Sequence, residues 1–248
     1  WRRNLDSAQR FYERAVALDP SFALAHAALS VVHGYIYFFA YDPSPARAVL
    51  QREAAEAALR LAPTLPQAHM AIGLADYWGR REYHRAMEEL RIALRGLPND
   101  AKLWQWIAAV HRRLGNWDEV EAAYERSAQL DPRNADLFVD LGGDTYTLLH
   151  RYPEAVRATD LALSLAPAMT LKGWIYVKWQ GRFDTLRAEL SRLPRNAELP
   201  VFGNVAANQL QLFLWERQPD SLLQVLKTAH PGAFEGQLFF LPSALYAA

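Results

Sequence analysis

Apolar positions in residues 101–132 recur with the spacing of an α-helix, in two separate runs. The first run stands at i, i+3, i+4 and i+7, which makes one stripe of a helix; its members are Trp104, Ile107, Ala108 and His111. The second run marks the inner face of another helix and comprises Trp117, Val120, Tyr124, Ser127 and Ala128. Gly115 and Asn116 separate the runs, and Pro132 ends the second one, because proline cannot donate the next helical hydrogen bond. The segment predicts a two-helix hairpin.

The end of this hairpin is repeated along the chain. Short phrases rich in Ala and Leu close with a proline each time, at Pro20, Pro63, Pro98, Pro132 and Pro167. The intervals between these prolines are 43, 35, 34 and 35 residues. A period of this size is typical of stacked helical repeats, in which one hairpin cannot bury its apolar face alone. The chain is therefore expected to be all-α.

The order of residues within the hairpins resembles the tetratricopeptide repeat. In residues 101–132 the resemblance rests on Trp104, Ile107, Ala108, Gly115, Trp117, Tyr124, Ala128 and Pro132. It extends to Phe138, Leu141, Gly142, Tyr152, Glu154, Ala155, Ala162 and Pro167 in the next unit, and to His69, Ile72, Gly73, Tyr83, Ala86, Leu90, Ala93 and Pro98 in the unit before. The resemblance covers residues 1–194. It implies a right-handed α-solenoid of stacked helix-turn-helix repeats with about 13 to 14 helices.

The repeat boundaries follow from the prolines. Residues 5–18 resemble the second helix of a first repeat, and further repeats are expected at about 21–63, 64–98, 99–132, 133–167 and 168–194. The first helix after Pro167 should be short, since the turn at Gly181 follows soon after. Residues 195–248 predict a degenerate helical pair, Val201–Glu216 and Ser221–Thr228, and the start of a further helix at Gly236–Ala247. Both termini would then lie inside a repeat, which suggests flanking sequence.

Charge and composition narrow the class of partner. Lys plus Arg number 27 and Asp plus Glu number 27, so the net charge is zero and a strong grip on nucleic-acid phosphates or anionic lipid is disfavoured. The chain has no cysteine, which excludes disulfides and thiolate metal sites. Residues 20–41 lack charged side chains over a length that could span a bilayer, but histidines, serines, glycine and many alanines favour a buried helix instead. The compartment stays open, with the cytoplasm favoured.

Tests for catalytic chemistry give no candidate. The histidines lack a metal-binding spacing, and His26, His69 and His111 occupy slots where packed neutral imidazole is expected. The adjacent carboxylates Glu88 and Glu89 point in different directions on a helix, so they are a poor acid/base pair. No phosphate-binding glycine loop or nucleophile elbow occurs. We expect no enzymatic activity, no metal and no cofactor.

The resemblance implies a partner-binding groove on a concave face lined by first helices. The residues expected to project into it lie opposite the packed stripes: Gln67, Met70, Lys102, Gln105, Trp106, Arg112, Arg113, Asp136, Asp140, Tyr146, Lys172 and Lys178. Trp106 is about 200° around the helix from Trp104, so both rings cannot be core. With Trp104 buried, Trp106 beside Lys102 and Arg113 would be an anchor for an extended peptide bearing an acidic group. Packing of Trp106 against a neighbouring repeat is the alternative.

The longest interval contains an aromatic insertion. It lies in residues 34–45 and includes Tyr35, Tyr37, Phe38, Phe39 and Tyr41. These rings could form a second interface, with a partner or another copy of the chain. Alternatively, the insertion lengthens two helices and folds back on the stack.

These patterns lead to a non-enzymatic scaffold that binds a peptide or protein partner. The repeats are similar to the interaction portions of bacterial multidomain regulators, so the chain is expected to be part of a larger bacterial protein. Two alternatives remain: a self-assembling module joined through open repeat ends or the aromatic insertion, and an RNA-binding array of pentatricopeptide type. The zero net charge counts against the second of these.

Overall fold

The computed structural model describes residues 2–39, 41–167, 171–194, 197–199 and 203–228. The further helix expected at Gly236–Ala247 lies outside these residues. The chain divides into two compact units, Trp1–Pro132 and Arg133–Ala248, and each is described by itself.

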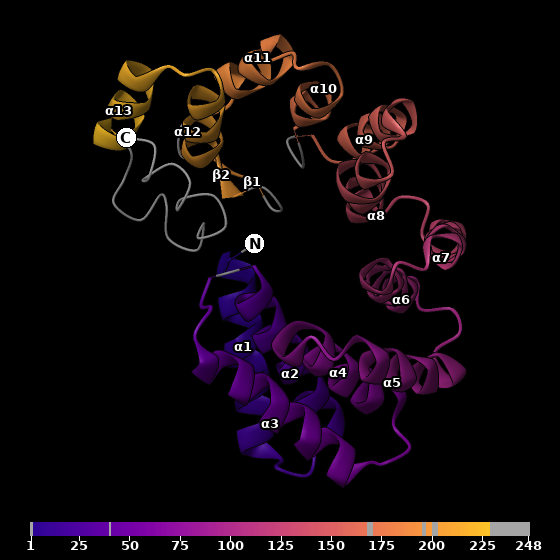
Figure 1. Ribbon diagram of the computed structural model, residues 1–248. Helices are drawn as coiled ribbons and strands as arrows, with labels where there is room; N and C mark the ends of the chain where they lie inside the picture. Colours follow the sequence, from indigo (N-terminus) through magenta and orange to yellow (C-terminus); the bar gives the residue numbers. More distant parts are fainter. Residues whose placement is uncertain (1, 40, 168–170, 195–196, 200–202, 229–248) are drawn as a thin grey trace. The chain divides into compact units, whose positions relative to one another are not determined.

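The first unit is a stack of antiparallel helices (Figure 1). Three consecutive pairs, α2 with α3, α4 with α5 and α6 with α7, are hairpins, and α1 packs on α2. The elements are α1 (Arg2–Leu18), α2 (Ala23–Phe38), α3 (Pro45–Leu61), α4 (Pro66–Ala75), the π-helical segment η1 (Asp76–Arg80), α5 (Tyr83–Gly96), α6 (Ala101–Leu114) and α7 (Trp117–Leu130).

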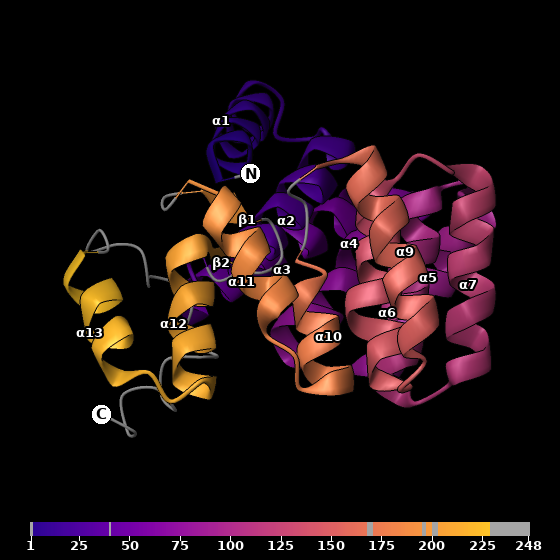
Figure 2. The same ribbon diagram turned by 90° about the horizontal axis from the view of Figure 1, so that it is seen from above.

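The second unit continues the same scheme with shorter helices, seen as successive pairs in Figure 2. Its elements are α8 (Ala135–Val139), the π-helical segment η2 (Asp140–Tyr146), α9 (Tyr152–Leu165), α10 (Gly173–Gln180), α11 (Asp184–Arg192), α12 (Val205–Trp215) and α13 (Pro219–Thr228). Helix α10 has 8 residues, as the short interval before Gly181 predicts. The all-α class and the stacked hairpins are thereby confirmed. One small feature was not predicted, an antiparallel pair of two-residue strands, β1 (Glu198–Leu199) and β2 (Gly203–Asn204).

The periodic prolines end the second helices. Each proline stands two residues after the last helical residue, as Pro98 does after Gly96 and Pro132 after Leu130. The residue between them still donates its N–H to a carbonyl four residues earlier, so the final helical turn is closed before the proline breaks the ladder. The residues that accept these bonds are small and fully buried in α3, α5, α7 and α9: Ala58, Ala93, Ser127 and Ala162.

Small residues on the first helices allow each hairpin to close. A Cβ on Gly73 would lie 2.9 Å from Leu90 Cγ, and a Cβ on Gly142 would collide with Thr159 Oγ1. The corresponding position in α6 is Ala108, which is fully buried. First and second helices therefore approach at distances that larger side chains would prevent.

One extra residue distinguishes the 35-residue repeats from the 34-residue repeat. The left-handed residue of the turn between helices is Arg81, Gly115 and His150 in three successive hairpins. It follows the preceding proline by 18, 17 and 18 residues, respectively. The two longer first helices are those that contain η1 and η2, whereas α6 is regular. A single insertion in an α-helix is accommodated as a π-helical turn, so the extra residue explains both segments.

The 43-residue repeat is lengthened in both of its helices. Helix α2 has 16 residues and α3 has 17, compared with 14 in each of α6 and α7. The insertion therefore extends two helices and its aromatic residues return to the stack. No helix in the described ranges combines the length and the apolarity needed to cross a bilayer.

Candidate partner-binding site

An aromatic cluster joins three consecutive first helices of the first unit. Its members come from α2 and the turn after it, from η1 and from α6, and are Tyr35, Phe38, Phe39, Tyr41, Trp78 and Trp106. The centre of the cluster is a triangle of rings: Tyr35 and Trp78 are 5.4 Å apart between centroids, Tyr35 and Trp106 are 5.7 Å apart, and Trp78 and Trp106 are 5.0 Å apart. The aromatic insertion thus meets the following two repeats.

Exposure rises from the centre of the cluster to its edge. Trp78 is 4% exposed and Trp106 is 9% exposed, whereas Phe38 is 41% exposed. Tyr35 and Phe39 are half-buried and stack with an interplanar angle of 2°. Aromatic pairs in such geometries are stabilised beyond the area they bury. The cluster is therefore a packed base that presents a partly open edge of rings to solvent.

A lysine adds positive charge to this base. Lys102 Nζ lies 4.9 Å from the centroid of the Trp106 ring, within the range of a cation–π contact. Lys102 is one turn before Trp106 on α6 and is half-buried. A positive charge therefore lies beside aromatic rings that an apolar side chain could contact.

The structure corrects two expectations about α6. The ring of Trp106 is largely buried, and Trp104, expected in the core, is half-buried. The reason is that Tyr35 and Trp78 fill the space in front of α6, which the spacing within α6 cannot reveal. Gln105, expected to face the groove, is 1% exposed. Of the two interpretations of Trp106, packing against neighbouring repeats is the one observed.

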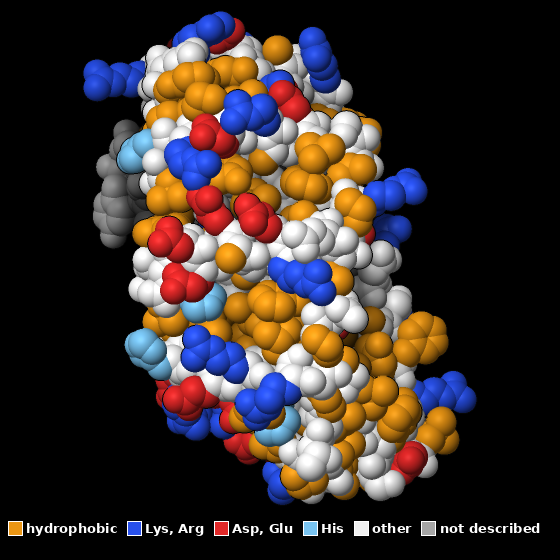
Figure 3. Space-filling view, turned by 90° about the vertical axis from the view of Figure 1, so that its right-hand side faces the viewer, with side chains coloured by type: hydrophobic (Ala, Val, Ile, Leu, Met, Phe, Trp, Pro, Cys, Tyr) orange, Lys and Arg blue, Asp and Glu red, His pale blue; other side chains and the backbone are white. Residues whose placement is uncertain are grey.

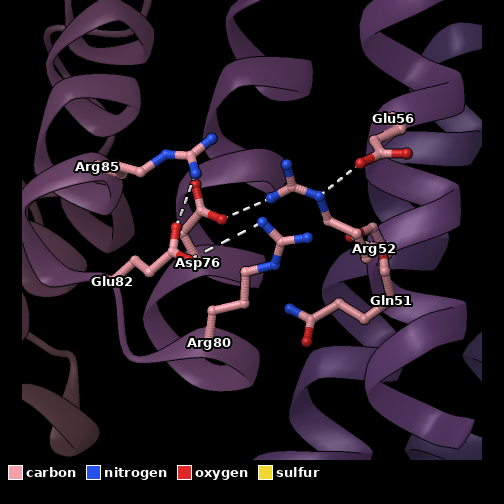
Figure 4. Close-up of polar contacts among 8 residues, drawn as sticks. Gln51, Arg52, Glu56, Asp76, Arg80, Glu82 and Arg85 are labelled. Atoms are coloured by element: carbon pink, nitrogen blue, oxygen red, sulfur yellow. Dashed lines mark hydrogen bonds and ion pairs between the residues drawn. The ribbon is translucent and has the colours of Figure 1, made fainter.

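A buried ion pair fixes the π-helical segment that carries Trp78. Asp76 begins η1 and is 1% exposed. Arg52 on α3 donates from Nη1 to Asp76 Oδ1 over 2.5 Å, and from Nε to Glu56 over 2.7 Å (Figure 4). Burial raises the pKa of the Asp76 carboxyl, and the positive charges of Arg52 and Arg85 counteract this rise. The pair ties η1 to α3 and so holds Trp78 beside α2.

Outer members of the network surround this pair. Arg85 Nη1 donates to Glu82 Oε2 over 2.9 Å, and Arg80 Nη1 lies 4.0 Å from the same carboxylate (Figure 4). These side chains are largely open to solvent, where an isolated ion pair contributes little. The structural contribution therefore rests on the buried Arg52–Asp76 contact.

The other side of α2 holds a buried histidine. His33 is 4% exposed, and its Nδ1 accepts a hydrogen bond from Arg47 Nη1 over 2.9 Å. Burial, with the nearby Arg47 charge, lowers the pKa of His33 to about 4, while Glu13 acts in the opposite direction. His33 is therefore neutral at physiological pH. Burial likewise lowers the pKa of His111.

His26 and His69, the other histidine slots, have a hydrogen-bonding role. Each is half-buried, and its Nε2 lies near a proline carbonyl, Pro20 for His26 at 3.0 Å and Pro63 for His69 at 2.9 Å. Nδ1 of His69 also lies 2.7 Å from Glu89. Within the described ranges, no three His, Asp or Glu side chains are placed to hold a metal ion.

The remaining expected groove residues differ in exposure. In the first unit Gln67, Met70 and Arg112 are half-buried and Arg113 is exposed. In the second unit Asp136, Asp140, Tyr146 and Lys172 are half-buried and Lys178 is exposed. Lys172 is held by Asp160 over 2.6 Å, and the Arg151 guanidinium lies 4.8 Å from the Tyr146 ring. Participation of these residues in binding remains a prediction, as does a second interface at the insertion residues Tyr35, Tyr37, Phe38, Phe39 and Tyr41.

Charges of both signs are interspersed on the surface. In the face shown by Figure 3, blue and red side chains alternate with hydrophobic patches. This distribution agrees with the zero net charge. It favours recognition by local contacts over attraction by a uniform basic field.

The comparisons with known proteins agree with the repeat pattern. The family model for the tetratricopeptide repeat matches residues 101–134, which contain α6 and α7. No curated protein matches the chain.

Several solved structures have similar folds. The human IFIT1 dimer with m7Gppp-AAAA is 12% identical with a TM-score of 0.71, over 91% of this chain and 55% of that one. The chain therefore spans about half the length of IFIT1. MamA is 21% identical with a TM-score of 0.46, over 66% of this chain and 90% of that one. Pseudomonas aeruginosa PilF is 20% identical with a TM-score of 0.47, over 96% of this chain and 90% of that one. At 12% identity, the likeness to IFIT1 concerns the fold.

Proposed function

We propose that this tetratricopeptide-repeat chain is a non-enzymatic scaffold that binds a peptide segment of a protein partner on the first-helix face of its first unit. The segment contacts the open edge of the aromatic cluster with an apolar side chain and approaches Lys102 with an acidic one. The first helices α2, α4 with η1, and α6 provide this face. The groove residues of the second unit are a separate set of candidate contacts and stay a prediction.

The aromatic cluster is the observation that supports this site best. A partly exposed Phe38 on a base of buried tryptophans is a preorganised apolar contact, because the Arg52–Asp76 pair and the ring packing already hold it in place. Binding therefore orders few side chains, and rigid aromatic residues are the type that dominates interface energies. Lys102 adds a charge that selects acidic partners.

Selection of peptides from a random display library tests the proposal. The wild-type chain is the bait, and the selected peptides are synthesised and titrated by fluorescence anisotropy. We expect them to combine a large apolar residue with Asp or Glu. Phe38→Ser and Lys102→Glu should each weaken binding by about tenfold or more, since each removes one kind of contact.

Matched variants on other surfaces distinguish binding at this site from non-specific association. Leu148 is 58% exposed and Lys227 is exposed, and both lie in the second unit. Leu148→Ser and Lys227→Glu should leave the affinities unchanged. Equal losses in both pairs of variants, or selected peptides without acidic residues, would overturn the proposal.

Direct binding of single-stranded RNA tests the alternative function. An RNA-binding array would retain labelled RNA and lose it steeply as salt rises, because phosphate contacts release counterions. We expect no such retention. Tight, salt-sensitive RNA binding would replace the peptide scaffold by the nucleic-acid alternative.

A further inference from the structure

Three turns of the second unit carry a large apolar side chain at the same position. In each turn between a first and a second helix one residue has a left-handed conformation, namely His150, Gly181 and Arg217. The residue two positions earlier is in each case a large apolar one, Leu148, Trp179 and Trp215. These side chains are 58%, 40% and 46% exposed, respectively. We call the three residues the tip row.

The hairpin fold does not require an apolar residue at this position. In the first unit, Gly79 and Arg113 stand two residues before the left-handed residues Arg81 and Gly115. Glycine offers no side chain for packing, and Arg113 is exposed. In the second unit, further hairpins follow the turns of Leu148 and Trp179 and still leave both side chains exposed. Packing within the stack therefore does not explain the tip row.

The three turns lie along one edge of the second unit. The helix pairs α8–η2 with α9, α10 with α11, and α12 with α13 follow one another, and neighbouring pairs contact through α9 and α10 and through α11 and α12. Because the helices of each pair are antiparallel, the turns after the first helices all point to the same side, the lower edge in Figure 2. The tip row is thus a line of separate apolar tips, each from a different hairpin.

Both tryptophans of the tip row are held in place by other rings. Trp179 stacks with Tyr152 at 5.7 Å between centroids and with Tyr176 at 6.3 Å, with interplanar angles of 13° and 16°. Trp215 contacts Trp174 edge to face at 5.2 Å. These contacts fix the direction of each indole and leave its outer part in solvent. Covering that outer part therefore costs little side-chain entropy.

The acidic side chains next to the tip row are offset locally. They lie in the first turns of the second helices, where the N–H groups of the helix end stabilise a negative charge: Glu154, Asp184 and Asp220. Arg151 and Arg182 form ion pairs with the first two of these. Glu216, beside Trp215, has a side chain that is 7% exposed and is paired with Arg187 of α11. These carboxylates therefore present little uncompensated negative charge.

Two cations beside the tryptophans have no such partner. Lys178 precedes Trp179 in the last turn of α10, and Arg217 is the left-handed residue after Trp215. Both are exposed, and neither forms an ion pair with another residue of the described ranges. The edge thus combines apolar tips with two available positive charges.

We propose that the tip row is a docking site for the surface of a lipid bilayer. Leu148 and the outer parts of both indoles enter the interfacial layer, which is the depth that tryptophan favours in membrane proteins. Lys178 and Arg217 remain at the level of the head groups and contact anionic ones. The site belongs to the second unit and does not depend on the function proposed above.

The separation of the tips favours a fluid surface over a protein partner. A protein would need one hollow for each tip at the intervals of the repeats, whereas lipids rearrange around every tip independently. The zero net charge of the chain disfavours a strong electrostatic grip. Binding scales with the apolar area that is buried, and three partly exposed side chains bury little. Docking is therefore weak and reversible, and apolar contact drives it together with the two cations.

Vesicles that contain brominated lipid test the proposal. Bromine in the upper part of the acyl chains quenches tryptophan fluorescence only where an indole enters the bilayer. The full chain is titrated with phosphatidylcholine vesicles that contain about a third of phosphatidylglycerol, with and without the brominated lipid. We expect quenching with the brominated lipid only, and co-sedimentation of the chain with both kinds of vesicle.

Apolar variants show whether the tip row is responsible. Leu148→Ser, Trp179→Ser and Trp215→Ser combined should weaken vesicle binding by about tenfold or more, because the inserted apolar surface is lost. The matched control replaces three side chains of α3 with similar exposure, Val49 at 54%, Leu50 at 44% and Leu61 at 44%. Their combined replacement by serine should leave binding unchanged. Circular dichroism establishes that each variant is folded.

Charge variants test the role of the two cations. Lys178→Glu with Arg217→Glu should weaken binding by about tenfold, since each basic residue near an anionic surface contributes to attraction. Arg91→Glu with Arg95→Glu makes the same change in charge at exposed positions of α5 and should have no effect.

Three results would overturn the proposal: no quenching of the wild type, equal losses in the tip-row and α3 variants, or unchanged binding after the Lys178 and Arg217 substitutions. Sedimentation of the chain without vesicles covers a different occupant. A dimer that Trp179→Ser dissociates would assign the tip row to a second copy of the chain.

Discussion

Trp104 Nε1 donates a hydrogen bond to the carbonyl oxygen of Pro98 over 3.0 Å. The bond joins the first turn of α6 to the proline that follows α5, so it connects one hairpin to the next. The same separation of six residues links His26 with Pro20 and His69 with Pro63. A proline carbonyl can only accept, so the Nε2–H of each histidine donates here as the indole N–H does. A ring N–H that hydrogen-bonds to a proline carbonyl is thus a recurrent link between consecutive hairpins.

Replacing the donor of this hydrogen bond tests how much the bond contributes to stability. Trp104→Phe keeps an aromatic ring but removes the N–H, and it should lower the free energy of unfolding by about 1 kcal/mol, the usual net value of one hydrogen bond. Urea denaturation monitored by circular dichroism measures the change. The next hairpin already has Phe138 at this position. An unchanged midpoint in Trp104→Phe would show that the bond contributes nothing to stability.

The turn residue Arg81 offers a stabilising substitution. Its φ of 58° lies in the left-handed region, where a side chain is strained, and the equivalent turn residue after α6 is Gly115 with φ of 77°. Arg81→Gly should therefore raise the free energy of unfolding by about 1 kcal/mol. Gly115→Ala is the reciprocal variant and should lower it by a similar amount. Thermal denaturation of both proteins checks the signs, and a loss of stability in Arg81→Gly would contradict the explanation.

Acid should destabilise the first unit through His33. The pKa of His33 falls from 6.5 in the unfolded chain to about 4 in the folded one, because burial and the Arg47 charge disfavour the imidazolium. The unfolded chain therefore binds the proton first, and the contribution of His33, complete above pH 6.5, is lost as the pH falls toward 4. We expect the wild type to lose about 2 kcal/mol more than His33→Gln between pH 7 and pH 4.

Urea titrations at each pH measure this difference. His84→Gln alters an exposed histidine on α5 and should retain the wild-type pH dependence. Parallel curves for the wild type and His33→Gln would exclude His33 as the cause.

Substitutions of Arg52 and Asp76 should have strongly non-additive effects on the free energy of unfolding. Asp76 Oδ2 is buried without a hydrogen-bond partner, so loss of Arg52 would remove the hydrogen bond to Oδ1 and leave the charge of Arg85 to offset the burial of the carboxylate. Arg52→Met should cost about 3 kcal/mol in the wild type and clearly less in the Asp76→Asn background. A double-mutant cycle in urea gives the coupling energy. Additive effects of the two substitutions would mean that the pair does not stabilise η1.

The spacing of residues in the sequence was sufficient to predict the hairpins. Proline ends a second helix wherever it occurs in the pattern, and small residues such as Gly73 must lie where two helices meet, so local chemistry determines these features. The short α10 follows from the distance to Gly181 in the same way.

Features that depend on neighbouring repeats could not be predicted. An extra residue shows in the 35-residue intervals, but whether it lengthens a loop or enters a helix as η1 and η2 depends on packing. The faces of Trp104 and Trp106 were misassigned for a related reason. The ring of Trp106 is covered by Tyr35 from a helix about seventy positions earlier, and helical spacing within α6 contains no information about that contact.

The indole resonances provide the most direct test of the scaffold account. The chain has 8 tryptophans, and two of them, Trp78 and Trp106, form the base of the aromatic cluster, whereas Trp179 and Trp215 lie in the second unit. Titration of the ¹⁵N-labelled chain with a display-selected peptide should shift the Trp78 and Trp106 indole signals and leave those of Trp179 and Trp215 in place. Shifts confined to Trp179 and Trp215, with Trp78 and Trp106 unchanged at saturation, would contradict binding at the first-helix face.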